Sequence, residues 1–130
     1  PYNAQLLRRS AFAERARGHL EAALGFGEAT LRLDPRGSSM YYWHGLTLLD
    51  LRRPAEARAA FDRTVELQPA AWYARVKRAL VDVTEGDLAA ARRSMRAARP
   101  SIEAGPLAAN VGRVGYDLVC LLDSASAAVL

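Results

Sequence analysis

A chain of 130 residues is long enough to bury a hydrophobic core without disulfide bonds or metal ions. Hydrophobic residues make up 51% of it and charged residues 25%, which argues against both a disordered chain and one inserted in a membrane. The net charge is +4, and nearly all of the positively charged residues are arginines, which are interleaved with Asp and Glu throughout.

Prolines and glycines divide the chain into stretches rich in Ala, Leu, Arg and Glu, which are strong helix formers. No run of β-branched and aromatic residues alternates with period two, so we predict no strands. The expected helices cover residues 3–17, 20–33, 38–52, 54–67, 70–85, 87–98 and 106–122, followed by a tail at 123–130. The connections are short, so consecutive helices are expected to pack antiparallel.

The stretch 54–67 illustrates the pattern, because its apolar residues recur every three or four positions and its charged residues take the other face. Pro54 suits the first turn of this helix, and Pro69 ends it because the residue before a proline resists helical angles. Asp87 is expected to cap the helix at 87–98 through its carboxylate.

Two segments of the chain are closely similar: residues 30–35 read TLRLDP and residues 64–69 read TVELQP, 34 positions later. Ala23, Ala57 and Ala91 follow the same spacing. Repetition at this period is typical of stacked helix pairs, in which no pair buries its apolar face alone.

These segments resemble the tetratricopeptide repeat family, whose motif spans 34 residues and closes with a proline. The resemblance covers about residues 4–103, in three copies at about 4–37, 38–71 and 72–105. The helix at 106–122 is either a capping helix or the first half of a fourth copy, and one domain spans 1–122. It implies an all-α fold of about seven helices, an antiparallel helix-pair solenoid that winds into a right-handed superhelix with a concave groove.

The middle copy fits the motif best, through Tyr41, Gly45, Leu48, Ala57, Phe61 and Pro69. His44 departs from it, since leucine is usual there. In the first copy Gly27 replaces a large residue, so loose packing is expected around it.

The third copy has polar residues at three expected apolar positions, Arg75, Arg78 and Asp82. Its apolar stripe runs through Trp72, Val76, Ala79, Leu80 and Val83, about one residue out of phase. We therefore expect a register shift or insertion in this copy, and an irregular end at Pro100.

In the family it resembles, the first helix of each pair lines the groove, and this implies the candidate binding residues. They are Arg8, Phe12 and Arg15, then Tyr42, Leu46, Leu49 and Asp50, then Tyr73, Val76 and Leu80. Aromatic, aliphatic and arginine side chains of this kind suit an extended or helical peptide. Phe12 and Trp43 stand where a grip on a terminal carboxylate would need asparagine, so that mode is not expected.

Nothing in the sequence nominates an enzyme, a cofactor or a metal site. The two histidines, His19 and His44, have no second His or Cys at metal-ligand spacing, and His44 is expected to be a packed structural residue. The single cysteine, Cys120, lies in an apolar run and is expected to be an inert thiol.

We therefore predict a protein-interaction scaffold or adaptor that binds a peptide, a partner protein or another domain of its parent chain. Nucleic-acid binding is the less favoured alternative, through the arginine face formed by Arg92, Arg93, Arg96 and Arg99. A homodimer also stays open, through a face made of Trp43, Trp72, the irregular third copy and the apolar last helix. The composition leads us to expect a bacterial protein, located in the cytoplasm.

Overall fold

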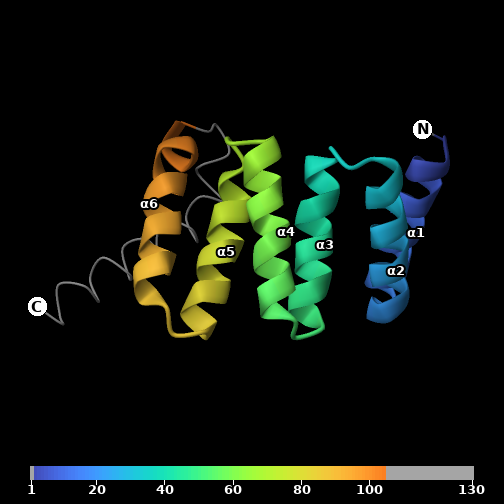
Figure 1. Cartoon of the computed structure of the whole chain (residues 1–130), viewed down its shortest axis with the longest axis horizontal. Helices are drawn as coiled ribbons and strands as arrows, with labels where there is room; N and C mark the ends of the chain where they lie inside the picture. The colour runs from blue at the N-terminus through green and yellow to red at the C-terminus, as the bar shows by residue number, and fades with distance from the viewer. Residues whose placement is uncertain (1, 105–130) are drawn as a thin grey trace, which may run out of the picture. The chain divides into compact units, whose positions relative to one another are not determined.

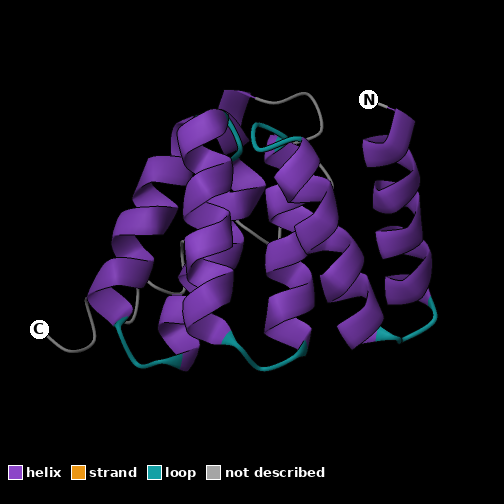
Figure 2. Cartoon of the chain, turned by 45° about the vertical axis from the view of Figure 1, so that its right-hand side comes forward, coloured by secondary structure: helices purple, strands orange, loops and turns teal. Residues whose placement is uncertain are grey.

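The computed structural model describes residues 2–104, with side chains from residue 3 to residue 101. Within this range the structure consists of helices and short connections, with no strand (Figure 2). The helices are α1 (Tyr2–Ala16), α2 (Leu20–Leu33), α3 (Ser38–Asp50), α4 (Pro54–Leu67), α5 (Trp72–Thr84) and α6 (Leu88–Ala104). The chain divides into two compact units, Pro1–Leu67 and Gln68–Leu130, which are described separately below.

The predicted helices at 20–33 and 54–67 have the same bounds as α2 and α4. Both ends of α1, α3, α5 and α6 lie within two residues of their predicted positions, with one exception. That exception is the end of α6, which was expected at residue 98. The prediction was wrong, because α6 continues through Pro100 to Ala104. The predicted helix at 106–122 and the tail at 123–130 lie outside the described residues.

In the first unit, α1 packs against α2 and α3 packs against α4, and α2 joins the two pairs by packing against α3 (Figure 1). α3 and α4 approach closely at Gly45 of α3, where a Cβ atom would lie 2.6 Å from the ring of Phe61. Phe61 itself is 0% exposed. Gly45 therefore lets a large ring of α4 pack directly on the α3 backbone.

At the contact between α2 and α3, a glycine of α2 leaves space that two larger side chains of α3 fill. Gly27 of α2 is buried, and a Cβ atom there would lie 2.9 Å from Nδ1 of His44 and 3.4 Å from Cε of Met40. The expectation of loose packing around Gly27 was wrong, because His44 and Met40 fill the space that a larger residue at 27 would take. His44 is half-buried, which agrees with the structural role predicted for it.

The turn inside each helix pair has the same backbone form at positions 18, 52 and 86. Gly18, Arg52 and Gly86 adopt positive φ values of 81°, 58° and 82°. Each donates its N–H to a carbonyl three residues earlier, and the next residue donates to a carbonyl five residues earlier. This is the Schellman arrangement that closes a helix with a left-handed residue.

In the second unit, α5 packs against α6 around Ala79, Ala91 and Met95, with Val76 and Val83 against them. Asp82 is only 1% exposed, and it follows Leu48, also buried, by one period. The predicted register shift was wrong. Ala79 and Asp82 are buried, like Gly45 and Leu48 one period of 34 residues earlier, and the turn at Gly86 follows the turn at Arg52 by the same period. The third copy keeps its register and carries a carboxylate at a core position. The cap predicted at Asp87 is confirmed, with its Oδ1 3.0 Å from the N–H of Ala90.

Candidate functional site

The seven candidate residues of the first unit come from α1 and α3, the first helix of each pair. None of them is buried: Arg8 and Asp50 are exposed, and the other five are half-buried. Along α1, the positions 8, 12 and 15 recur at four- and three-residue intervals and share one face of the helix. The structure therefore leaves this set of side chains accessible rather than enclosed in the core.

A small apolar hollow lies where α1 and α3 meet on this face. It has a volume of about 410 Å³ and is lined by Phe12, Arg15, Ala16 and Trp43. The rings of Phe12 and Trp43 meet edge to face, with centroids 5.4 Å apart and planes at 66°. Trp43 remains 40% exposed, which is unusual for so large an apolar side chain.

Trp43 was not among the groove residues inferred from the sequence, although it lines this hollow. A signal for it was present, because Trp43 precedes Leu46 by three residues and Asp50 by seven, which places the three on one face of α3. Tyr42 lies beside it, with ring centroids 5.8 Å from Trp43 and 5.9 Å from Phe61. Tyr42 thus connects the exposed aromatic pair to the core.

Arg15 and Asp50 contact each other across α1 and α3. Nη2 of Arg15 lies 2.7 Å from Oδ2 of Asp50, and Nη1 donates to Oγ1 of Thr47 at 3.2 Å. The Arg15 side chain is 22% exposed and that of Asp50 is 50% exposed. These two candidate binding residues therefore link the helices and hold one wall of the hollow in place.

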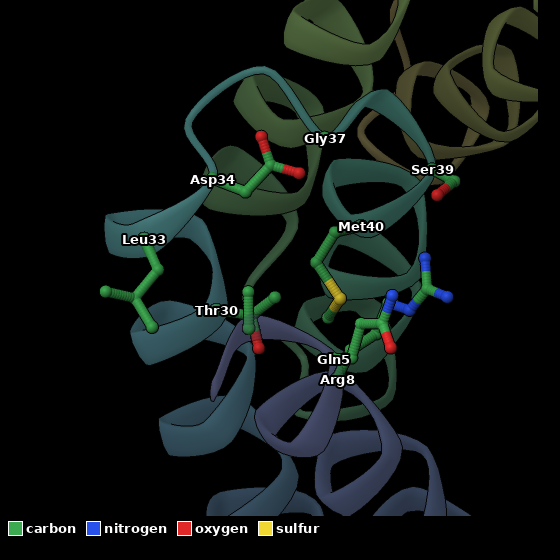
Figure 3. Close-up of a pocket in the computed structure, with 9 residues that line it drawn as sticks. Gln5, Arg8, Thr30, Leu33, Asp34, Gly37, Ser39 and Met40 are labelled. Atoms are coloured by element: carbon green, nitrogen blue, oxygen red, sulfur yellow. The ribbon is translucent and has the colours of Figure 1, made fainter. Parts of the chain in front are cut away.

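A second pocket, of about 440 Å³, lies near the start of both helices (Figure 3). Its lining comes from α1, the end of α2, the following turn and the start of α3: Ala4, Gln5, Arg8, Thr30, Leu33, Asp34, Gly37, Ser39 and Met40. Arg8 reaches into it from α1, and Figure 3 shows its guanidinium group on the Ser39 side of Met40. Sequence reasoning found Arg8 but gave no reason to expect a pocket around it.

The three candidates of the second unit lie on α5 and are all half-buried. Tyr73 packs edge to face against Trp72, with centroids 6.0 Å apart. Val76 packs against the Ala79–Ala91–Met95 cluster, so part of its surface belongs to the core of this unit.

Other polar groups of the described residues show no catalytic arrangement of the kind sought in the sequence. Burial lowers the pKa of His44, and its Nδ1 has no hydrogen-bond partner. His19 is exposed and lies 2.7 Å from Glu14, a contact that lowers the pKa of that carboxyl. In the described residues no group of three His, Cys, Asp or Glu side chains is placed to hold a metal ion.

The arginine face of α6 is partly engaged within the protein. Arg93, Arg96 and Arg99 are exposed and Arg92 is half-buried, but Arg92, Arg96 and Arg99 each take part in an interaction in the structure. Among the helices described, none has the length and apolar character needed to cross a membrane.

No protein-family model and no curated protein matches this sequence. Solved structures do match. The type III secretion chaperone SycD of Yersinia enterocolitica, in complex with a peptide of the translocator YopD, is 16% identical, with 97% of this chain and 96% of that chain covered and a TM-score of 0.90. The TPR2B domain of yeast Sti1, in a complex with pHsp70, is 18% identical over 95% and 98% of the two chains, with a TM-score of 0.85.

The first TPR of Spaghetti (RPAP3), bound to an HSP90 peptide, is 13% identical over 97% and 94% of the two chains, with a TM-score of 0.81. At these identities the likeness establishes the fold. The all-α helix-pair architecture implied by the sequence is confirmed, as a tetratricopeptide-like helical-repeat fold.

Proposed function

Since the chain has a tetratricopeptide-like fold, we propose that it is a protein-interaction module that binds a peptide segment of a partner on the face of α1 and α3. The hollow between Phe12 and Trp43 receives an apolar side chain of that peptide. The module acts by binding and positioning its partner, without a catalytic residue or a cofactor.

The observation that carries this proposal is the exposure of Trp43 beside Phe12. A tryptophan that keeps 40% of its surface exposed next to a second ring presents apolar area that a partner could bury. Burying such a side chain stabilises a complex by about 1.5–3 kcal/mol, and tryptophan is enriched among the residues that dominate interface energies.

The likeness to solved structures supports the same function. SycD was solved with a peptide of YopD and the RPAP3 repeat with an HSP90 peptide, so the fold serves peptide binding in those proteins. In this chain, Arg15 and Asp50 position the two helices. Tyr42, Leu46 and Leu49 are half-buried on α3 and offer further contacts to the peptide. Tyr73, Val76 and Leu80 form a separate candidate surface on α5 of the second unit. A domain of the parent chain or a second copy could supply the bound segment, and the expected setting is a bacterial cytoplasm.

The test is a selection from a displayed library of random 12-residue peptides, with the whole chain as bait. Binders selected on the unaltered protein should lose at least about tenfold in affinity for Trp43→Ala, by fluorescence anisotropy. Leu6→Ala is the matched control, because Leu6 is 45% exposed on α1 but does not line the hollow. Circular dichroism should show both variants folded. Binders that a folded Trp43→Ala variant retains at full affinity would refute this site.

A further inference from the structure

The charge around the hollow defines what kind of side chain it can take. Arg15 lines the hollow, and its charge is balanced by Asp50 at 2.7 Å. The other lining residues, Phe12, Ala16 and Trp43, carry no charge. A cation would meet the Arg15 guanidinium, and an anion would compete with Asp50 for it. The hollow therefore suits a neutral, bulky apolar side chain.

One helical turn before the hollow, α1 carries a positive charge that no carboxylate among the described residues balances. Arg8 precedes Phe12 by four residues on the same face of α1, so their Cβ atoms lie about 6 Å apart. Arg8 is exposed, and it has no ion-pair partner in the described part of the chain. Its pocket contains one carboxylate, that of Asp34, which accepts a hydrogen bond from the N–H of Arg36 at 3.3 Å. Figure 3 shows Asp34 on the opposite side of Met40 from Arg8.

The pocket of Arg8 and the hollow lie along one seam between α1 and α3. On α1 the lining passes from Ala4, Gln5 and Arg8 to Phe12, Arg15 and Ala16, and on α3 it passes from Ser39 to Trp43. The positions 4 to 16 of a helix span about 18 Å, which matches about five residues of an extended peptide. One short segment can therefore reach both places.

We propose that the bound peptide carries a bulky apolar residue, held between Phe12 and Trp43, and an acidic side chain within four residues of it, held by Arg8. This inference rests on the proposed function and specifies its ligand. An internal Asp or Glu side chain is sufficient, because a single guanidinium group can bind a carboxylate through two parallel hydrogen bonds. Segments with Lys or Arg at that place are repelled.

The experiment repeats the peptide selection on four forms of the whole chain: unaltered, Arg8→Glu, Arg9→Glu and Trp43→Ala. Arg9→Glu is the control for net charge, since Arg9 is also exposed on α1 but lines neither pocket. The unaltered protein and Arg9→Glu should both enrich peptides with an apolar residue and a nearby Asp or Glu. Arg8→Glu should enrich Lys or Arg at the same spacing instead.

A synthetic peptide taken from the selection, acetylated and amidated so that its ends carry no charge, then measures the contact. Replacing its acidic residue by the amide should weaken binding to the unaltered protein about tenfold and binding to Arg8→Gln less than twofold. This inference would be overturned if the enriched peptides showed no acidic preference, or if that preference survived Arg8→Glu. In either case, binding that still depends on Trp43 would leave the proposed function standing. Selected peptides that bind Trp43→Ala unchanged would overturn both.

Discussion

At the scale of single residues, Arg52 is the feature that the repeat does not explain. The equivalent turn positions hold Gly18 and Gly86, which adopt positive φ without a steric penalty. Arg52 adopts a φ of 58° and is exposed, so its side chain gains little from the core. A residue with a Cβ atom pays about 1 kcal/mol for the left-handed conformation.

Arg52→Gly should therefore raise the stability of the protein by about 0.5–1 kcal/mol, because glycine removes that penalty but also frees the unfolded chain. Thermal unfolding followed by circular dichroism should show a midpoint a few degrees higher. The reverse change, Gly86→Arg, should lower the midpoint by a similar amount and serves as the matched control. An unchanged or lower midpoint for Arg52→Gly would mean that the Arg52 side chain stabilises the turn in another way.

At the scale of helices, the ion pair of Arg15 and Asp50 joins α1 to α3, as the ring contact of Phe12 with Trp43 also does, whereas α1 packs mainly on α2. The pair is partly exposed, so its contribution to global stability is modest, below about 1 kcal/mol. Its larger effect is expected on the hollow, since Arg15 and Trp43 line it from the two helices that the pair connects. A positioning role of this kind predicts coupling between the two residues.

Arg15→Ala and Asp50→Ala should each weaken binding of a selected peptide, and the double variant should be no weaker than the worse single one. A double-mutant cycle by anisotropy measures this coupling. Arg17→Ala is the control, because Arg17 pairs with Glu14 on α1 itself and does not line the hollow. Additive losses would indicate that Arg15 and Asp50 contact the peptide independently.

The helices could be predicted closely from the sequence because prolines, glycines and caps mark most of their ends. Pro100 misled the prediction, since a proline within a helix removes one backbone hydrogen bond but does not always end it. Asp82 caused the wrong prediction of a register shift in the third copy. Repeat positions are assigned from the pattern of apolar residues, and a buried carboxylate breaks that pattern.

The face on which we propose the site follows from the resemblance, but the arrangement of its side chains could not be predicted. Arg15 has an ion-pair partner on α3 and Arg8 has none in the described part of the chain. This difference depends on how closely α1 and α3 approach each other, which the sequence does not specify. The same holds for Trp43, whose ring is brought to Phe12 by that approach.

At the scale of the whole molecule, the proposed site is complete within the first unit, since the seam and both pockets come from residues 4–43. The stability of this unit depends on the contact of α2 with α3, where His44 packs against Gly27. Burial of His44 lowers its pKa, with Glu28, Arg53 and Glu56 acting on it more weakly. Arg53 lowers the pKa of Glu56, so this carboxylate stays ionised near neutral pH.

This burial makes the fold sensitive to acid. His44 takes up a proton less readily when folded than when unfolded, where its pKa is about 6.5. Stability is therefore complete above that pH and decreases as the pH falls below it, until the pH passes the folded pKa. Urea unfolding between pH 7.5 and about pH 5 should show this decrease. His44→Gln should flatten it, and His19→Gln, at the other histidine, should leave it in place. An equally steep decrease in His44→Gln would assign the acid sensitivity to other groups.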